Sequence, residues 1–117
     1  MINFEYDLGV VGLGYVGLPL AVESANAGLK VMGYDVNSQR VQEINSGKSP
    51  IEDISDNELS KASNSFAASD DPALLSKCQH IVISVPTPLT VSHNNIIPIG
   101  ATSLTVNSEE NSYVALS

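Results

Sequence analysis

The sequence predicts an α/β fold, namely a doubly wound parallel sheet that is incomplete, with about four strands and an irregular C-terminal tail. Short apolar runs at residues 8–11, 31–34 and 80–85 are typical of buried parallel strands. Segments with helical periodicity separate these runs, as expected for strands joined by right-handed crossovers. Three glycines follow the first run with the spacing G-x-G-x-x-G, which suits a tight turn from a strand into a helix.

The first half of the chain contains two predicted helices with clear end signals. One spans residues 16–27 and is followed by Gly28, which is placed as a left-handed cap. After the second strand, Asn37 or Ser38 caps another helix that runs through Asn45. These segments complete a β-α-β-α order.

The next segment is predicted to hold two short helices around a short strand. Ser55 and Glu58 form a capping-box pattern at the start of the first of these helices. Residues 66–68 are the third strand. The second helix, over residues 72–77, begins with proline and is capped by one of the two aspartates before it.

The glycine turn and a downstream acid point to a dinucleotide site. Gly12 allows the tight turn, Gly14 lets a pyrophosphate approach the backbone, and Gly17 lets the helix pack closely on the strand. Asp35 ends the second strand, 18 residues after Gly17, where the fingerprint expects a carboxylate that accepts from a ribose hydroxyl. This acid favours NAD over NADP. The alternatives are a glycine turn that is purely steric and an aspartate that only begins a turn.

Four segments together resemble the N-terminal NAD-binding domain of the UDP-glucose/GDP-mannose dehydrogenase family, in the branch that acts on UDP-N-acetyl-hexosamines. The resemblance extends from about residue 8 to residue 90. It is carried by Gly-Leu-Gly-Tyr-Val-Gly-Leu-Pro-Leu-Ala at 12–21, by Asp-Val-Asn at 35–37 with Arg-Val at 40–41, by the segment 44–54, and by Val-Pro-Thr-Pro-Leu at 85–89.

The resemblance implies a Rossmann-type fold that binds NAD. The cofactor-binding residues that follow from the motifs are Gly12, Leu13, Gly14, Tyr15, Val16, Gly17, Asp35, Arg40, Pro86 and Thr87. For Arg40, a solvated position on a helix surface is an equal alternative, because long cationic side chains commonly lie there. For Thr87, the alternative is a turn residue between two prolines.

The family's reaction is the two-step oxidation of the C6 alcohol of a UDP-sugar to a carboxylate, with NAD as the hydride acceptor. Residues 1–90 are expected to form the N-terminal part of the NAD-binding domain. Residues 91–117 depart from the family pattern and are expected to be disordered, frame-shifted or a loose edge strand. The catalytic residues, the sugar-binding half and the dimerising helix of the family would all lie beyond this point, so no residue is assigned a catalytic role. Cys78 is expected to be a buried or half-buried bystander.

These expectations define the function as the NAD-binding portion of a nucleotide-sugar 6-dehydrogenase, inactive as a 117-residue chain. The UDP-sugar would be a partner only of the full-length parent. The alternatives are a non-catalytic dinucleotide-binding module and a nonfunctional gene fragment.

Composition argues against several other classes of protein and site. With 13 acidic and 5 basic residues the net charge is −8, which disfavours binding to nucleic acid or to an anionic membrane. A single cysteine excludes an internal disulfide and a cysteine-rich metal site, and no metal site is expected. No apolar run approaches the roughly 20 residues of a membrane helix, and the acidic start is unlike a signal peptide, so the expected location is the cytoplasm.

Overall fold

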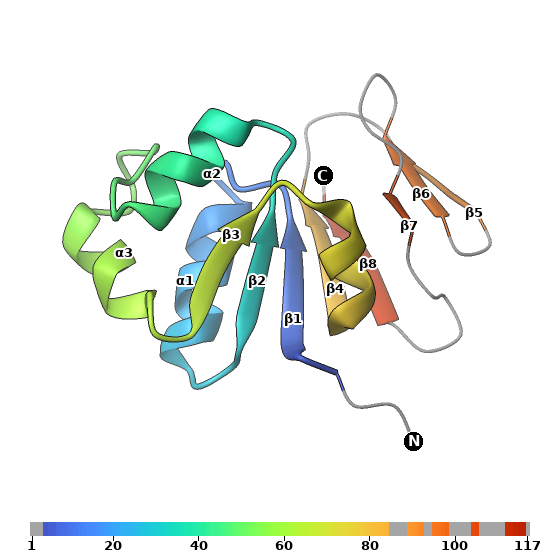
Figure 1. Cartoon of the computed structure of the whole chain (residues 1–117), viewed down its shortest axis with the longest axis horizontal. Helices are drawn as coiled ribbons and strands as arrows, with labels where there is room; N and C mark the ends of the chain where they lie inside the picture. Colours follow the sequence, from blue (N-terminus) through green and yellow to red (C-terminus); the bar gives the residue numbers. More distant parts are fainter. Residues whose placement is uncertain (1–3, 85–88, 93–94, 99–103, 106–111, 117) are drawn as a thin grey trace.

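The computed structural model describes residues 4–84, 89–92, 95–98, 104–105 and 112–116, with side chains described for residues 4–84. A parallel sheet is flanked by helices, and a small antiparallel sheet lies beside it (Figure 1). The elements in order are β1 (Tyr6–Val11), α1 (Gly17–Asn26), β2 (Val31–Tyr34), α2 (Ser38–Asn45), α3 (Asp56–Ala62), β3 (Phe66–Ser69), the 3-10 helix η1 (Pro72–Lys77), β4 (Cys78–Ser84), β5 (Leu89–Ser92), β6 (Asn95–Pro98), β7 (Leu104–Thr105) and β8 (Ser112–Leu116).

The main sheet has the strand order β3-β2-β1-β4-β8, and each neighbouring pair is parallel. Its register aligns Val11 at the end of β1 with Tyr34 of β2 and with Ile83 of β4. The carboxyl ends of these strands therefore meet at one edge, as the arrowheads in Figure 1 show. The predicted doubly wound α/β fold is confirmed.

The β1-α1-β2 unit follows the sequence signals closely. Helix α1 has Val16 as its N-cap and Ala27 as its C-cap, and β2 has the predicted bounds. Gly28 has a φ of 101°, a left-handed conformation that glycine adopts without steric cost. Strand β1 begins at Tyr6, two residues before the predicted start, where Tyr6 pairs with Cys78 of β4.

The predicted caps of the next two helices are also present. The Asn37 side chain accepts a hydrogen bond from the backbone N–H of Arg40, so Asn37 rather than Ser38 caps α2. Helix α3 opens with the complete capping box, in which Ser55 and Glu58 bond reciprocally.

The segment before β4 is helical but takes the tighter 3-10 form. Asp71, not Asp70, caps it by accepting from the Ala73 N–H, and Pro72 occupies the first turn. Turns of 3-10 helix are frequent as connectors between other elements.

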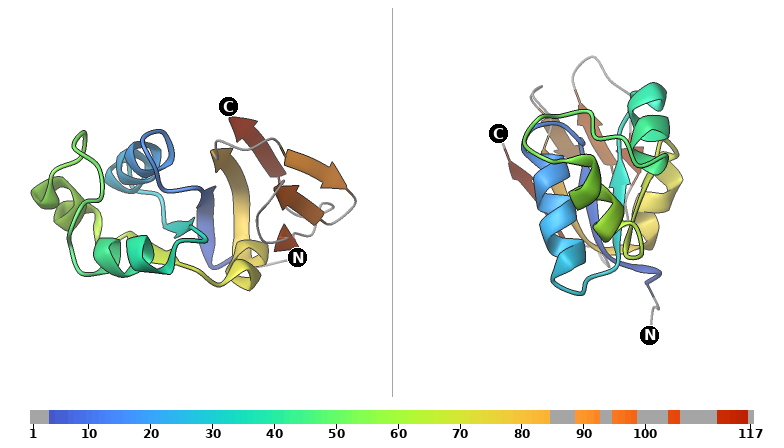
Figure 2. Two further views of the ribbon diagram at one scale, coloured as in Figure 1. Left: turned by 90° about the horizontal axis from the view of Figure 1, so that it is seen from above. Right: turned by 90° about the vertical axis from the view of Figure 1, so that its left-hand side faces the viewer.

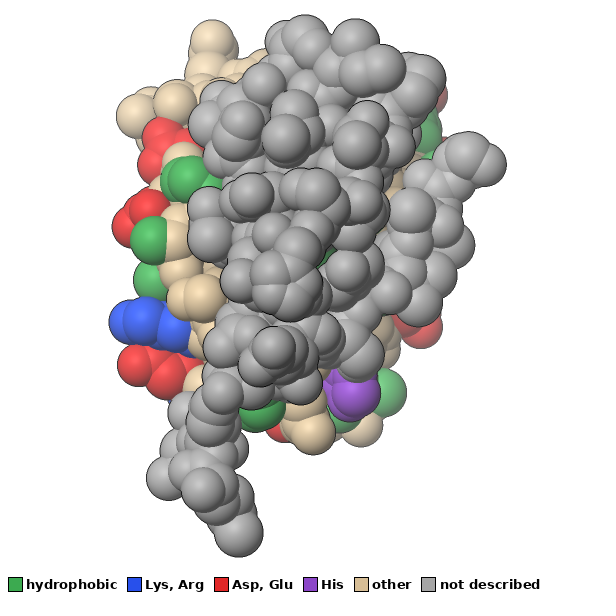
Figure 3. Space-filling model, turned by 90° about the vertical axis from the view of Figure 1, so that its right-hand side faces the viewer, with side chains coloured by type: hydrophobic (Ala, Val, Ile, Leu, Met, Phe, Trp, Pro, Cys, Tyr) green, Lys and Arg blue, Asp and Glu red, His purple; other side chains and the backbone are tan. Residues whose placement is uncertain are grey.

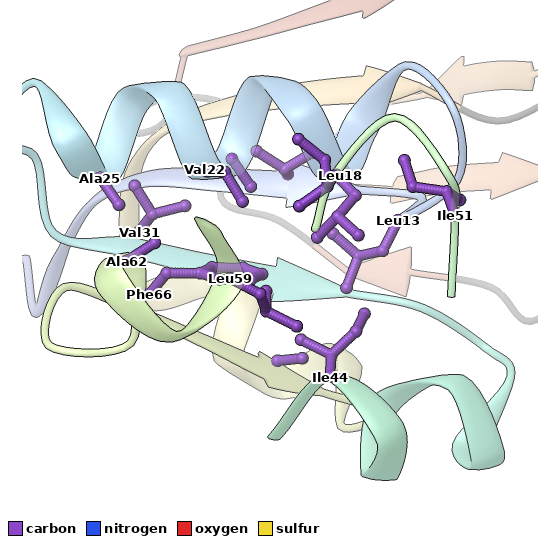
Figure 4. Close-up of a cluster of buried hydrophobic side chains, with 14 of the residues drawn as sticks. Leu13, Leu18, Val22, Ala25, Val31, Ile44, Ile51, Leu59, Ala62 and Phe66 are labelled. Carbon is purple, nitrogen blue, oxygen red and sulfur yellow. The ribbon is translucent and has the colours of Figure 1, made fainter. Parts of the chain in front are cut away.

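Two apolar clusters cover the two faces of the sheet. The first packs α1, α2 and α3 onto β1, β2 and β3, and Figure 4 shows Leu13, Leu18 and Phe66 pointing into it. The second lies under η1 and includes Leu75 and Ile83, both fully buried. Figure 2 shows α1 and η1 on opposite sides of the strands.

The C-terminal tail contains strands. β5, β6 and β7 form an antiparallel sheet of their own. β8 pairs in parallel with β4 and forms the edge of the main sheet, so β4 is an internal strand.

Among the described residues, none of the helices is both long and apolar enough to cross a membrane. On the face shown in Figure 3, acidic side chains lie along the margin together with a Lys or Arg side chain and a histidine.

Candidate functional site

The carboxyl ends of β1 and β2 bring the glycine turn and Asp35 together. Gly12 directly follows β1, and Asp35 directly follows β2. The Gly12 N–H donates to the Tyr34 carbonyl oxygen at 2.8 Å, which extends the pairing of the two strands into the turn. In open α/β sheets this edge is where ligands bind, in the crevice outside the strand ends.

The three glycines meet three different constraints. Gly12 has a φ of 95°, which a residue with a side chain adopts only with strain. A Cβ on Gly17 would lie 1.6 Å from the Gly12 carbonyl oxygen, so only glycine fits at that helix–turn contact. Among the described residues, a Cβ on Gly14 would meet only the Arg40 Nη1 atom, at 3.7 Å. Sterics inside the fold therefore explain Gly12 and Gly17, whereas the space over Gly14 is open to a ligand.

The N-terminus of α1 faces this space without a side-chain cap. Val16 occupies the N-cap position and provides no side-chain hydrogen bond, and the first turn has no acidic residue. Tyr15 and Val16 are 67% and 54% exposed, which is high for apolar residues of this size. An uncapped helix N-terminus offers backbone N–H groups and a positive dipole end to an anion.

Leu13 differs from its neighbours because its side chain is fully buried in the first cluster. Only its backbone belongs to the turn. Its N–H donates to Asp35 Oδ2 at 2.9 Å.

Asp35 is the buried acid of the site, with an exposed fraction of 8%. Its Oδ2 accepts from Leu13, and its Oδ1 accepts from the Asn37 N–H at 2.9 Å. A carboxylate has about four lone-pair positions, so acceptor capacity is left for ribose hydroxyls. Asp35 therefore links the glycine turn to the start of α2 and still suits the predicted contact with a ribose.

Arg40 lies in the first turn of α2 and faces the glycine turn. Its Nη1 atom is 3.7 Å from Asp35 Oδ2, and its side chain is 35% exposed. A contact between Arg40 and the adenosine end of a dinucleotide stays a prediction, and the pairing with Asp35 was not anticipated.

Pro86 and Thr87 lie outside the described residues, so their roles stay predictions. Cys78 is fully buried at the amino end of β4, opposite the edge that carries the glycine turn. Burial raises the pKa of its thiol to about 12, so it stays protonated at neutral pH. Its predicted role as a buried bystander agrees with this position.

One acidic residue of the 52–56 segment has a structural partner. Asp56 Oδ1 accepts from the Ser49 N–H at 2.8 Å and holds the preceding loop. Across the described residues, no cluster of acidic, histidine and cysteine side chains could hold a metal ion.

Sequence reasoning missed the tie between Asp35 and Leu13. The spacing of the motif specifies where the acid lies, but it does not reveal that a backbone N–H of the turn already points at it. The available signal was the burial expected for a residue at the end of an internal strand, because a buried carboxylate needs donors.

Residues 6–107 match the family described as UDP-glucose/GDP-mannose dehydrogenase family, NAD binding domain. The match continues past Thr90, where the sequence was expected to leave the family. Protein CapL of Staphylococcus aureus is 35% identical over 102 residues, covering 86% of this chain and 23% of CapL. A UDP-N-acetyl-D-glucosamine 6-dehydrogenase of Pseudomonas aeruginosa is 40% identical over 88 residues, covering 73% of this chain and 20% of the relative. The chain thus spans about a fifth of the length of these relatives.

Solved structures give the same assignment. A GDP-mannose dehydrogenase from Pseudomonas aeruginosa superposes with a TM-score of 0.65 and 31% identity, covering 72% of this chain and 20% of that one. A UDP-D-ManNAc dehydrogenase from Pyrococcus horikoshii superposes with a TM-score of 0.64 and 36% identity. The match covers 71% of this chain and 21% of that one. From the strand order, the glycine turn and these matches, the chain belongs to the UDP-glucose/GDP-mannose dehydrogenase family and corresponds to its NAD-binding domain.

Proposed function

We propose that this chain binds NAD along the carboxyl edge of its sheet, with the pyrophosphate over Gly14. The observation that carries the proposal is the space over Gly14 in the described part of the chain, where a Cβ would meet only the end of the Arg40 side chain. The uncapped N-terminus of α1 supplies donors to the phosphates, and the exposed Tyr15 and Val16 border the same space.

The adenosine ribose is proposed to lie against Asp35. This carboxylate is held by two backbone N–H groups, so its orientation is fixed before a ligand arrives. A ribose with free 2′ and 3′ hydroxyls can donate to it, whereas a 2′-phosphate would place negative charge beside it. Arg40 completes this end of the site. Pro86 and Thr87 are proposed to contact the nicotinamide half.

NAD, when bound, would accept a hydride from the substrate, and the chain would bind and orient it. We propose that the complete protein is a nucleotide-sugar 6-dehydrogenase that oxidises the C6 alcohol of a UDP-sugar to the carboxylate in two steps. The names of the relatives as UDP-N-acetyl-D-glucosamine 6-dehydrogenases and UDP-N-acetyl-D-mannosamine dehydrogenases support this substrate class. The absence of turnover by the 117 residues alone stays a prediction.

The test is isothermal titration of the folded chain with NADH and NADPH. NADH is expected to bind more tightly, because Asp35 disfavours the 2′-phosphate. Equal affinities would remove Asp35 from its role, and no binding of either nucleotide would contradict the proposed function.

A further inference from the structure

A groove outside the edge strand β3 is separate from the proposed cofactor edge. It has a volume of about 480 Å³ and lies between the C-terminal part of α2, helix α3 and β3, the elements at the left of Figure 1. Small-molecule sites usually have volumes of about 300 to 1,000 Å³. The floor of the groove includes the buried side chains of Ile44, Leu59 and Phe66, which belong to the first apolar cluster (Figure 4). Its rim includes the exposed residues Ser46, Ser60 and Ser63.

The backbone of Phe66 presents a donor and an acceptor on the outer side of β3. In a parallel pair, successive residues of a strand direct their N–H and C=O groups to opposite sides. The Val31 N–H donates to the Ser65 carbonyl oxygen at 2.7 Å, so the odd-numbered residues of this stretch face β2. Phe66 and Ala68 therefore face outward. Among the described residues, no group bonds to the outward N–H and C=O of Phe66, although this residue is only 6% exposed.

The next outward pair along the edge shows which chemistry matches. Asn45 donates from its side-chain nitrogen to the Ala68 carbonyl oxygen at 2.8 Å and accepts from the Ala68 N–H at 3.0 Å. A primary carboxamide can do this because its N–H and C=O lie on the same side of one carbon atom. A trans secondary amide points the two groups in opposite directions.

This arrangement favours a small molecule over an added peptide strand. A strand that paired along β3 would need the outward groups of both Phe66 and Ala68, and Asn45 already occupies those of Ala68. One donor–acceptor pair is left beside an apolar floor. None of the described residues that line the groove is charged, so an anion or a cation would lose hydration there without a compensating partner.

We propose that this groove binds a small neutral molecule that carries a primary carboxamide or a lactam, whose N–H and C=O pair with the backbone of Phe66. The apolar body of the ligand lies against Ile44 and Leu59. A second N–H of a primary carboxamide can donate to a serine oxygen of the rim. The site lies at the end of α2 opposite to Arg40, and it does not depend on the proposed binding of NAD.

Benzamide is the probe, because it joins a primary carboxamide to a neutral ring. Titration of the ¹⁵N-labelled 117-residue chain is expected to shift the Phe66 amide signal, with a dissociation constant of about 1 to 10 mM for so small a ligand. N-methylbenzamide keeps the ring but carries a trans secondary amide, and it should bind at least about tenfold more weakly. Equal affinities would indicate strand-like pairing and overturn the proposal. An unchanged Phe66 signal up to the solubility limit of benzamide would also overturn it.

Two variants of α3 test the location of the site. A Cβ on Gly47 would lie 3.6 Å from Ser60 Oγ, so the Ser60 side chain points toward the Gly47 wall of the groove. Ser60→Phe should therefore fill the groove and weaken benzamide by about tenfold or more. Asn57→Phe is the matched control, because Asn57 is exposed on the same helix and is not a lining residue, and it should leave the affinity unchanged.

Retained affinity in Ser60→Phe would overturn the proposal, and the comparison of the two probes on the native chain decides if this variant fails to fold. NADH at saturation should leave the benzamide shift at Phe66 unchanged. Competition between the two would place benzamide at the cofactor edge and contradict the separate site. A native chain that binds benzamide but not NADH would contradict only the proposed function, so the two failures are distinguishable.

Discussion

At the scale of single residues, Gly14 and Gly17 belong to the same motif, but different neighbours explain why each is a glycine. The structure gives Gly17 a neighbour inside the fold and Gly14 an open face. A Cβ on Gly17 would overlap the Gly12 carbonyl oxygen, whereas a Cβ on Gly14 would touch, within residues 4–84, only the flexible end of the Arg40 side chain. The motif therefore combines a packing requirement with a proposed ligand requirement, and these are separable by substitution.

Gly14→Val and Gly17→Val make a matched pair that separates the two requirements. Gly14→Val is expected to weaken NADH binding by about 100-fold, because charge-assisted contacts to the phosphates are lost. Its free energy of unfolding should change by less than about 1 kcal/mol, since Gly14 has no positive φ and its Cβ would meet, among the described residues, only the movable end of the Arg40 side chain. Gly17→Val should cost about 3 kcal/mol or more through overpacking.

Urea denaturation and NADH titration of both variants check this pair. Retained NADH affinity in Gly14→Val would mean that no phosphate approaches there. A stable Gly17→Val would contradict the close contact with Gly12.

At the scale of elements, β3 is an edge strand of the main sheet, and α2 covers its outer side. The Asn45 side chain donates to the Ala68 carbonyl oxygen at 2.8 Å and accepts from the Ala68 N–H at 3.0 Å, as a residue of a further strand would. At the other end of α2, the Ser38 hydroxyl donates to Asp70 at 2.7 Å. Unpaired edges invite pairing with another chain, so Asn45 protects this edge.

Asn45→Ala is expected to lower the free energy of unfolding by about 1 to 2 kcal/mol, because two hydrogen bonds to the backbone are lost. It should also increase self-association, because the Ala68 groups become available to a second chain. Light scattering over a range of concentrations and urea denaturation are the measurements.

Gln42→Ala is the matched control on the exposed side of the same helix and should leave both properties unchanged. A monomeric Asn45→Ala at all concentrations would show that α2 covers the edge without this amide.

The elements of the first 84 residues could be predicted because their determinants are local. Ser55 with Glu58, Asn37 and the left-handed Gly28 each act within a few residues, and each is present in the structure. The site was predictable to the same extent, since spacing places Gly14 and Asp35 at one edge of a parallel sheet. The pairing of Asp35 with Leu13 and Arg40 was not, because it depends on how α2 and the turn are oriented around β2.

At the scale of the whole molecule, the tail gave the least information. Its strands β5 to β7 pair with one another, and β8 pairs with β4, about 30 positions earlier in the sequence. Such pairing follows from which edge is free after the other strands are placed, and no local pattern encodes it. The absence of helical periodicity after residue 90 argued against helices there, but it did not predict which strands the tail would pair with.

The position of β8 leads to a prediction about cooperativity. If β8 pairs with β4 as part of one sheet, the backbone amides that join the two strands should exchange with solvent as slowly as those that join β4 to β1.

Because NADH binds only the folded state, its presence at 100 times its dissociation constant should add about 2.7 kcal/mol to the stability of the whole cooperative unit. Amides that exchange through global unfolding should then slow by about 100-fold in both strands. Hydrogen exchange with and without NADH measures this, and NADPH at the same concentration is the control, with a smaller slowing expected. Rapid exchange in residues 112–116, while β4 stays protected, would place β8 outside the cooperative sheet.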